Sequence, residues 1–137
     1  MKIETRARAR AVQAVYAWDV TGAESLERVS ERLWDDIVVT GTVRQRAAAL
    51  VKAVDERGAA IDALLRDVTE NWRLERLGAI ERSVLRVAAA ELAMEETPPK
   101  VVIQEAVRLT ERFGSEASAR FVNGVLDALA RHMGRLT

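Results

Sequence analysis

The chain has 137 residues, of which 49% are hydrophobic and 31% charged. It is therefore long enough for one compact core and too apolar for a disordered protein, and its 21 basic and 21 acidic side chains give no net charge overall. The sequence has no cysteine and a single histidine, which excludes disulfides, cysteine-ligated zinc and histidine metal clusters, so we expect neither a metal site nor a cofactor.

Apolar residues recur at helical spacing along most of the chain, and the β-branched alternation of strands is almost absent, so an all-α fold is predicted. Ser25 and Ser115 are predicted N-caps, and Pro99 suits the first turn of a helix. Gly58 is expected to end the third helix. Seven helices are predicted, over residues 5–19, 26–37, 43–58, 61–68, 77–92, 99–114 and 115–129.

The fifth predicted helix, over residues 77–92, has a broad apolar face. Such a face implies contact on more than one side, so this helix is expected at the centre of the core. Asn71-Trp72-Arg73 is predicted to be a connector before it. Within this connector, Trp72 is either a core residue or a contact for a partner protein.

The basic charge is concentrated at the start of the chain. Residues 1–18 carry a net charge of +3, whereas residues 19–75 carry −4 and residues 76–137 carry +1. On a helix, Lys2, Arg6, Arg10 and Gln13 share one side and Arg8 points elsewhere. Two interpretations stay open for this arm: a solvated helix end, or a surface that contacts nucleic-acid phosphates. Tyr16, further along the same helix, suits either base stacking or core packing.

An Asn-Gly pair, Asn123-Gly124, lies inside the last predicted helix. Glycine in a helix interior costs about 1 kcal/mol relative to alanine, and Asn-Gly otherwise indicates a turn. We therefore expect another helix to pack closely against Gly124, with the Asn123 amide hydrogen-bonded to neighbouring backbone.

Acidic residues are frequent on the fifth and sixth predicted helices, but no catalytic arrangement accompanies them. No histidine, cysteine or glycine-rich loop stands beside them to indicate a nucleophile or a phosphate cradle, so no catalytic residue is assigned and the protein is not expected to be an enzyme. The spacing of Glu111 to Arg108 and Arg112 is instead typical of a salt-bridged helix surface. The acidic residues considered are Glu91, Glu95, Glu96, Glu105 and Glu111.

No apolar stretch approaches the ~20 residues needed to cross a bilayer, and residues 1–10 lack the apolar centre of a signal peptide. We therefore expect a cytoplasmic protein with no membrane partner. Because the chain shows no internal repeat, low-complexity tract or long linker, residues 1–137 are expected to form a single domain.

Several motifs occur in a characteristic order: RARAVQAVY over residues 8–16, LERL, IERSVLR and EL within residues 74–92, PKVVIQEAV over residues 99–107, and FVNGVLD over residues 121–127. Together they resemble the NusB family of transcription antitermination factors over nearly the entire chain. The resemblance implies seven helices in two three-helix bundles set roughly perpendicular. It also implies a non-enzymatic role: pairing with NusE, a small-subunit ribosomal protein, and binding boxA RNA in the transcription elongation complex, in support of ribosomal RNA synthesis.

The resemblance also assigns individual residues to surfaces. Arg6 and Arg8 match the family's arginine-rich RNA-binding arm, and Lys100 and Phe121 match positions near the RNA surface. Glu81 resembles the acidic residue that faces NusE. The full assignment to RNA binding is Lys2, Arg6, Arg8, Arg10, Gln13, Tyr16, Lys100 and Phe121, and the assignment to partner binding is Trp72, Glu75 and Glu81.

The chain departs from the family pattern in several places. Thr5, Ala7 and Ala9 interrupt the arginines of the arm, which predicts a lower RNA affinity than that of relatives with consecutive arginines. The other departures are Ala90, where an aromatic is common, Gln104, where asparagine is usual, and Ala117, where some relatives are acidic.

Two alternatives to an antitermination factor stay open. One is the RNA-binding N-terminal domain of a ribosomal RNA cytosine methyltransferase, which requires a further domain with catalytic cysteines. The other is a helical interaction scaffold in which the N-terminal arginines are dispensable. The sequence leaves both monomer and homodimer open, together with the RNA sequence preference.

Overall fold

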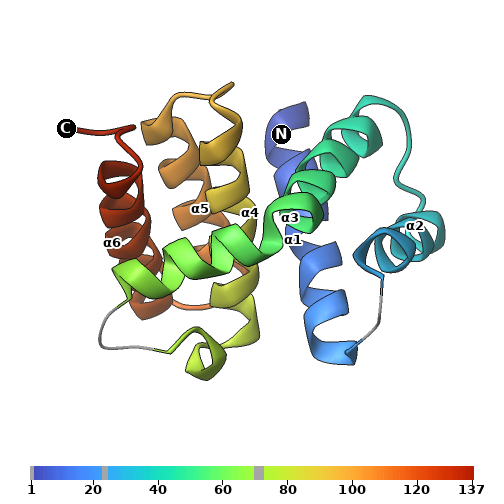
Figure 1. The fold of residues 1–137 in the computed structure, drawn as a ribbon. Coiled ribbons are helices and arrows are strands. Elements are labelled where there is room, and N and C mark those ends of the chain that lie inside the picture. The colour runs from blue at the N-terminus through green and yellow to red at the C-terminus, as the bar shows by residue number, and fades with distance from the viewer. Residues whose placement is uncertain (1, 23–24, 70–72) are drawn as a thin grey trace.

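A computed structural model describes residues 2–22, 25–69 and 73–137. These residues form α-helices and one short 3-10 helix, without a strand, which confirms the all-α prediction (Figure 1). The elements are α1 (Ile3–Thr21), α2 (Leu26–Asp36), α3 (Gly41–Val68), η1 (Leu74–Arg76), α4 (Ala79–Met94), α5 (Pro99–Phe113) and α6 (Glu116–His132).

The predicted break at Gly58 is wrong, because α3 is one helix of 28 residues that passes through this glycine. Leu50, Val51 and Val54 are buried before Gly58, and Ile61 and Leu65 are buried after it. Helices in proteins are stabilised mainly by the packing of such apolar faces, and that packing outweighs the ~1 kcal/mol propensity cost of one glycine. The described residues therefore contain six α-helices, one fewer than predicted.

The predicted helix starts are confirmed where local chemistry sets them. The Ser25 Oγ accepts a hydrogen bond from the Arg28 N–H at 3.2 Å, and the Ser115 Oγ accepts one from the Ser118 N–H at 3.1 Å. Pro99 is the first residue of α5. Each cap satisfies a backbone donor that has no partner inside its own helix.

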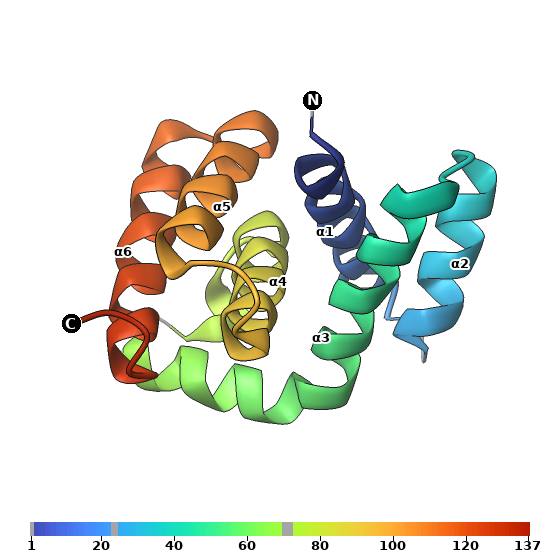
Figure 2. The same ribbon diagram turned by 90° about the horizontal axis from the view of Figure 1, so that it is seen from above.

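Helix α4 lies at the centre of the core, as its broad apolar face predicts. It contacts α1, α3, α5 and α6, and Figure 2 shows it between the α5–α6 pair and the helices α1 and α3. Val84, Leu85 and Leu92 on α4 are almost completely buried. Ala90, the position where an aromatic is common, is also fully buried there. Helix α3 runs across both sides of the molecule (Figure 1).

The predicted close packing at Gly124 is also wrong. Gly124 is exposed, and a Cβ built on it would meet no atom within 4 Å. Asn123 is exposed as well. The apolar face of α6, represented by Val122 and Val125, turns toward the core and leaves the Asn-Gly pair on the outer face.

Candidate nucleic-acid interface

The basic arm forms the first turns of α1, and its arginines have three different environments. Arg6 is exposed together with Lys2, whereas Arg10 is half-buried. The Arg10 Nη1 donates a hydrogen bond to the Gln13 Oε1 at 3.0 Å. Tyr16 is 37% exposed, so its ring is open to a partner rather than enclosed in the core. These five side chains form the exposed arm.

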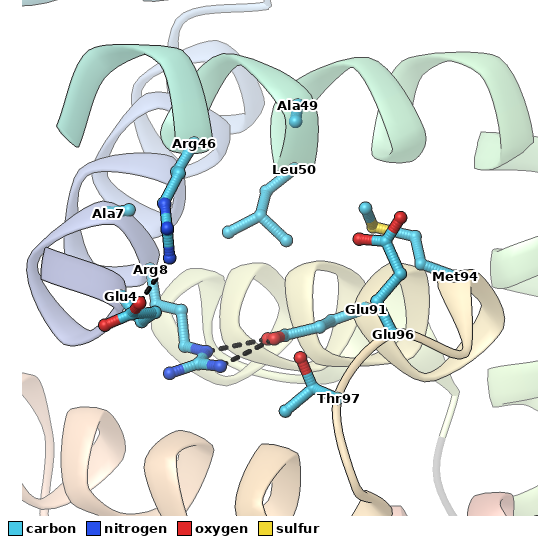
Figure 3. Close-up of a pocket in the computed structure, with 10 residues that line it drawn as sticks. All are labelled: Glu4, Ala7, Arg8, Arg46, Ala49, Leu50, Glu91, Met94, Glu96 and Thr97. Carbon is cyan, nitrogen blue, oxygen red and sulfur yellow. Dashed lines mark hydrogen bonds and ion pairs between the residues drawn. The ribbon is translucent and has the colours of Figure 1, made fainter. Parts of the chain in front are cut away.

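Arg8 belongs to the interior rather than to the exposed arm. It is only 7% exposed, and its Nε and Nη2 donate to the two carboxylate oxygens of Glu91 at 2.8 and 2.7 Å (Figure 3). Its Nη1 donates to the Glu105 Oε1 at 3.1 Å. The hydrogen bonds that Arg8 donates to Glu91 raise the pKa of Arg8 against the opposing effect of burial. Arg8 thus joins α1 to α4 and α5, and its guanidinium is engaged by two carboxylates inside the fold.

A basic cleft lies beside this buried cluster, between the start of α1 and the last turns of α5. Figure 2 shows these two ends next to each other. The cleft has a volume of about 350 Å³. Its lining residues are Lys2, Thr5, Arg8, Glu105, Arg108, Leu109 and Arg112.

Arg108 and Arg112 are the basic residues at this cleft that the sequence analysis did not assign to RNA. The expected pairing of Glu111 with Arg108 is replaced by a contact of the Arg108 Nη1 with the Glu105 Oε2, 3.6 Å away. Arg112 stacks on the ring of Phe113, with its guanidinium carbon 5.4 Å from the ring centre. Their i, i+4 spacing on a predicted helix was a signal that they share a face, but the sequence did not show that this face meets the arm.

Lys100 and Phe121 are not part of the cleft. Lys100 is exposed in the first turn of α5, at the opposite end of that helix from Arg108 and Arg112. Phe121, on α6, is half-buried and packs against the core. Gln104 and Ala117, two of the positions that depart from the family pattern, are both exposed.

The residues assigned to a protein partner lie on η1 and the start of α4. The Glu81 Oε1 accepts a hydrogen bond from the Ser118 hydroxyl at 2.5 Å, which links α4 to the first turn of α6. Glu75 is exposed and pairs with Arg66 at 2.7 Å, and this hydrogen bond lowers the pKa of Glu75. Trp72 lies outside the described residues.

Two arginines of the IERSVLR motif hold in place the region that carries Glu75 and Glu81. The Arg82 side chain donates to the Leu77 carbonyl at 2.5 Å and to the Asp19 carboxylate at 2.6 Å, so it ties the segment after η1 to the end of α1. Arg86 donates to Asp19 at 3.2 Å and to both oxygens of Asp62, on α3, at 3.0 and 3.1 Å. Burial lowers the pKa of Arg86, but the hydrogen bonds that it donates to these two carboxylates leave its pKa raised overall.

No group of three or more metal-binding side chains occurs within residues 2–22, 25–69 and 73–137. None of the helices in this part of the chain is long and apolar enough to cross a membrane.

Comparisons with known proteins show the family of this chain. The chain is 44% identical over 127 residues to the transcription antitermination protein NusB of Anaeromyxobacter dehalogenans, covering 92% of this chain and 89% of that protein. It is 39% identical to the NusB of Sorangium cellulosum over 99% of this chain and 97% of that one. Among solved structures, the antitermination factors NusB and NusE in complex with dsRNA match with a TM-score of 0.88 and 27% identity, over 96% of this chain and 98% of that one. The NusB of T. maritima matches with a TM-score of 0.86 and 32% identity, over 93% and 90%. The profile of the NusB family matches residues 5–131, and the chain belongs to this family.

Proposed function

We propose that the protein is an RNA-binding transcription antitermination factor that pairs with NusE and binds boxA RNA, in support of ribosomal RNA transcription. One observation carries this proposal: the fold matches, over nearly its full length, a NusB that was solved together with NusE and dsRNA. The exposed arm supplies the charge that such binding needs, because Lys2 and Arg6 are open to solvent on a chain that has no net charge overall.

The RNA surface in this proposal consists of the exposed arm together with Lys100 and Phe121. Guanidinium groups bind phosphate in a forked geometry and stack on unpaired bases, and an aromatic ring such as that of Tyr16 provides a further stacking surface. Arg8 acts on this RNA surface indirectly. Its ion pairs with Glu91 and Glu105 hold α1 against α4 and α5 and thereby set the direction of the arm.

The NusE surface in this proposal consists of Glu75, Glu81 and Trp72. A carboxylate repels RNA phosphates and attracts a basic protein, so Glu75 and Glu81 suit a protein partner better than RNA. Arg82 and Arg86 support this surface from within the fold by holding η1 and α4 to α1 and α3.

The remaining expectations belong to the same proposal. Residues 1–137 act as one RNA-binding domain, with the helices arranged as two roughly perpendicular three-helix bundles. The protein works in the cytoplasm on the transcription elongation complex.

A titration of labelled boxA RNA with the protein, alone and with NusE, tests the proposed function. We expect boxA RNA to bind more tightly than a scrambled RNA of the same length and composition, and NusE to strengthen the binding. Equal binding of boxA and scrambled RNA in the presence of NusE would contradict the proposal.

The variant Glu81→Lys tests the protein surface separately. Reversing this charge should weaken capture of NusE more than binding of RNA by the isolated chain. Ser118→Ala is the matched control, because it removes the hydrogen bond to Glu81 and keeps the carboxylate. Capture of NusE by Glu81→Lys at the level of the unmodified protein would show that Glu81 lies outside this surface.

A further inference from the structure

The basic cleft between α1 and α5 contains a buried oxygen without a hydrogen-bond donor. Glu105 is 8% exposed, and its Oε2 is the one buried side-chain oxygen or nitrogen in the described part of the chain that lacks a hydrogen-bond partner. Its Oε1, in contrast, accepts bonds from the Thr5 hydroxyl at 2.5 Å and from Arg8 at 3.1 Å. One oxygen of this carboxylate thus accepts two hydrogen bonds, whereas the other accepts none, and the residue lines the cleft.

The donors nearest to this oxygen do not satisfy it. Arg8 is engaged by Glu91 and by the other oxygen of Glu105. The Arg108 Nη1 stands 3.6 Å from the Oε2, which is an ion-pair distance and too long for a hydrogen bond. A buried acceptor that is left unsatisfied is costly, so a donor supplied by a ligand would remove a penalty that the free protein carries.

Exposed cations form the rim of the cleft around the buried carboxylate of Glu105. Lys2, Arg108 and Arg112 line it together with the apolar Leu109. Cations at the rim attract phosphate, and the volume of about 350 Å³ is that of a small-ligand pocket. The cleft therefore combines contacts for an anion, an apolar wall and one acceptor that needs a donor.

We propose that this cleft binds one nucleotide of single-stranded RNA, whose base amino group donates to the Glu105 Oε2 while its phosphates lie against Lys2, Arg108 and Arg112. The inference rests on the proposed RNA function and adds a base preference to it. Cytosine, adenine and guanine carry an amino group, and a carboxylate accepting from the cytosine amino group is a known form of base recognition. Uracil has no amino group, and its one ring N–H donor lies between two carbonyl oxygens that the carboxylate would repel. The cleft is thus selective against uracil.

Nuclear magnetic resonance titration of the full chain with cytidine monophosphate, uridine monophosphate and inorganic phosphate tests this proposal. We expect cytidine monophosphate to shift the backbone amides of Thr5, Arg108 and Leu109 and to bind about tenfold more tightly than uridine monophosphate, the effect of one hydrogen bond to a charged group. Equal binding of the two nucleotides, or of inorganic phosphate alone, would overturn the base-recognition step.

Two variants assign the effect to the cleft. Glu105→Gln should remove the preference for cytidine, because the amide that replaces the carboxylate is a weaker acceptor and carries no charge. Should this variant fold poorly, Arg108→Ala provides the second test, since it lies on the exposed rim and should weaken both nucleotides without changing their ratio. Arg32→Ala, exposed on α2, is the matched control and should change neither. An unchanged preference in Glu105→Gln, or unchanged affinity in Arg108→Ala, would overturn the proposal.

A comparison of hexameric oligocytidine with the mononucleotide identifies the source of the ligand. The hexamer should bind more tightly, because its neighbouring phosphates reach the exposed arm. If the mononucleotide binds as tightly as the hexamer, the cleft is a site for free nucleotides and the RNA proposal for the cleft fails. Tight binding of boxA RNA that is insensitive to both cleft variants would overturn this inference and leave the proposed function standing.

Discussion

The arginines near the start of α1 differ in burial, and the difference lies in which face of the helix each occupies. Helical spacing separates Arg8 from Arg6 and Arg10, so this much of the site follows from the sequence. The partners of Arg8 do not follow from it. Glu91 and Glu105 lie 83 and 97 residues further along the chain, and only the packing of α1 against α4 and α5 brings them together.

Replacing Arg8 by alanine should destabilise the fold by about 3–5 kcal/mol, because two buried carboxylates would lose their counter-charge. The free energy of unfolding in urea measures this effect. Arg6→Ala, on the exposed side of the same helix, is the control and should change it by less than ~0.5 kcal/mol. Similar stabilities of the two variants would mean that Arg8 is not a structural residue.

Replacing Gly124 by alanine should stabilise the protein by about 0.5–1 kcal/mol. The new methyl group would meet no atom within 4 Å, and alanine loses less conformational freedom than glycine on entering a helix. Unfolding of this variant in urea measures the change in the free energy of unfolding. A loss of stability would mean that another helix does pack closely against Gly124.

At the scale of elements, features determined by neighbouring residues were predicted correctly. Ser25 and Ser115 cap their helices and Pro99 begins α5, because each effect acts within one turn. The predictions at Gly58 and Gly124 are wrong, because each infers the surroundings of the glycine from its low helix propensity alone. The structure leaves open space beside each of them.

The continuity of α3 can be tested at Gly58. Alanine at this position should raise the free energy of unfolding by about 0.5–1 kcal/mol if residues 41–68 are one helix. Equilibrium unfolding gives the value, and amide hydrogen exchange at residues 56–62 shows whether the helix is continuous there. A turn at Gly58 with a positive φ angle would instead make alanine destabilising.

On the scale of the whole molecule, the fold gathers basic side chains from distant parts of the chain at one cleft, although the sequence has no net charge. The arm and the end of α5 form a basic region, while Glu75 and Glu81 lie on η1 and α4. The central position of α4 could be predicted from its broad apolar face. The meeting of Lys2 with Arg108 and Arg112 could not, because it depends on how two helices about a hundred residues apart in sequence pack together.

The salt dependence of RNA binding tests most directly the claim that the exposed arm binds RNA phosphates. Each phosphate contact to single-stranded RNA contributes about 0.7 to the slope of log affinity against log salt concentration. Changing Arg6 and Arg10 together to alanine should reduce the magnitude of the slope for boxA RNA by about 1.4, since two contacts are lost. Arg28→Ala/Arg32→Ala, a matched pair exposed on α2, should leave it unchanged. If the Arg6/Arg10 variant binds boxA RNA with the affinity and slope of the unmodified protein, the arm is a solvated helix end and the account is contradicted.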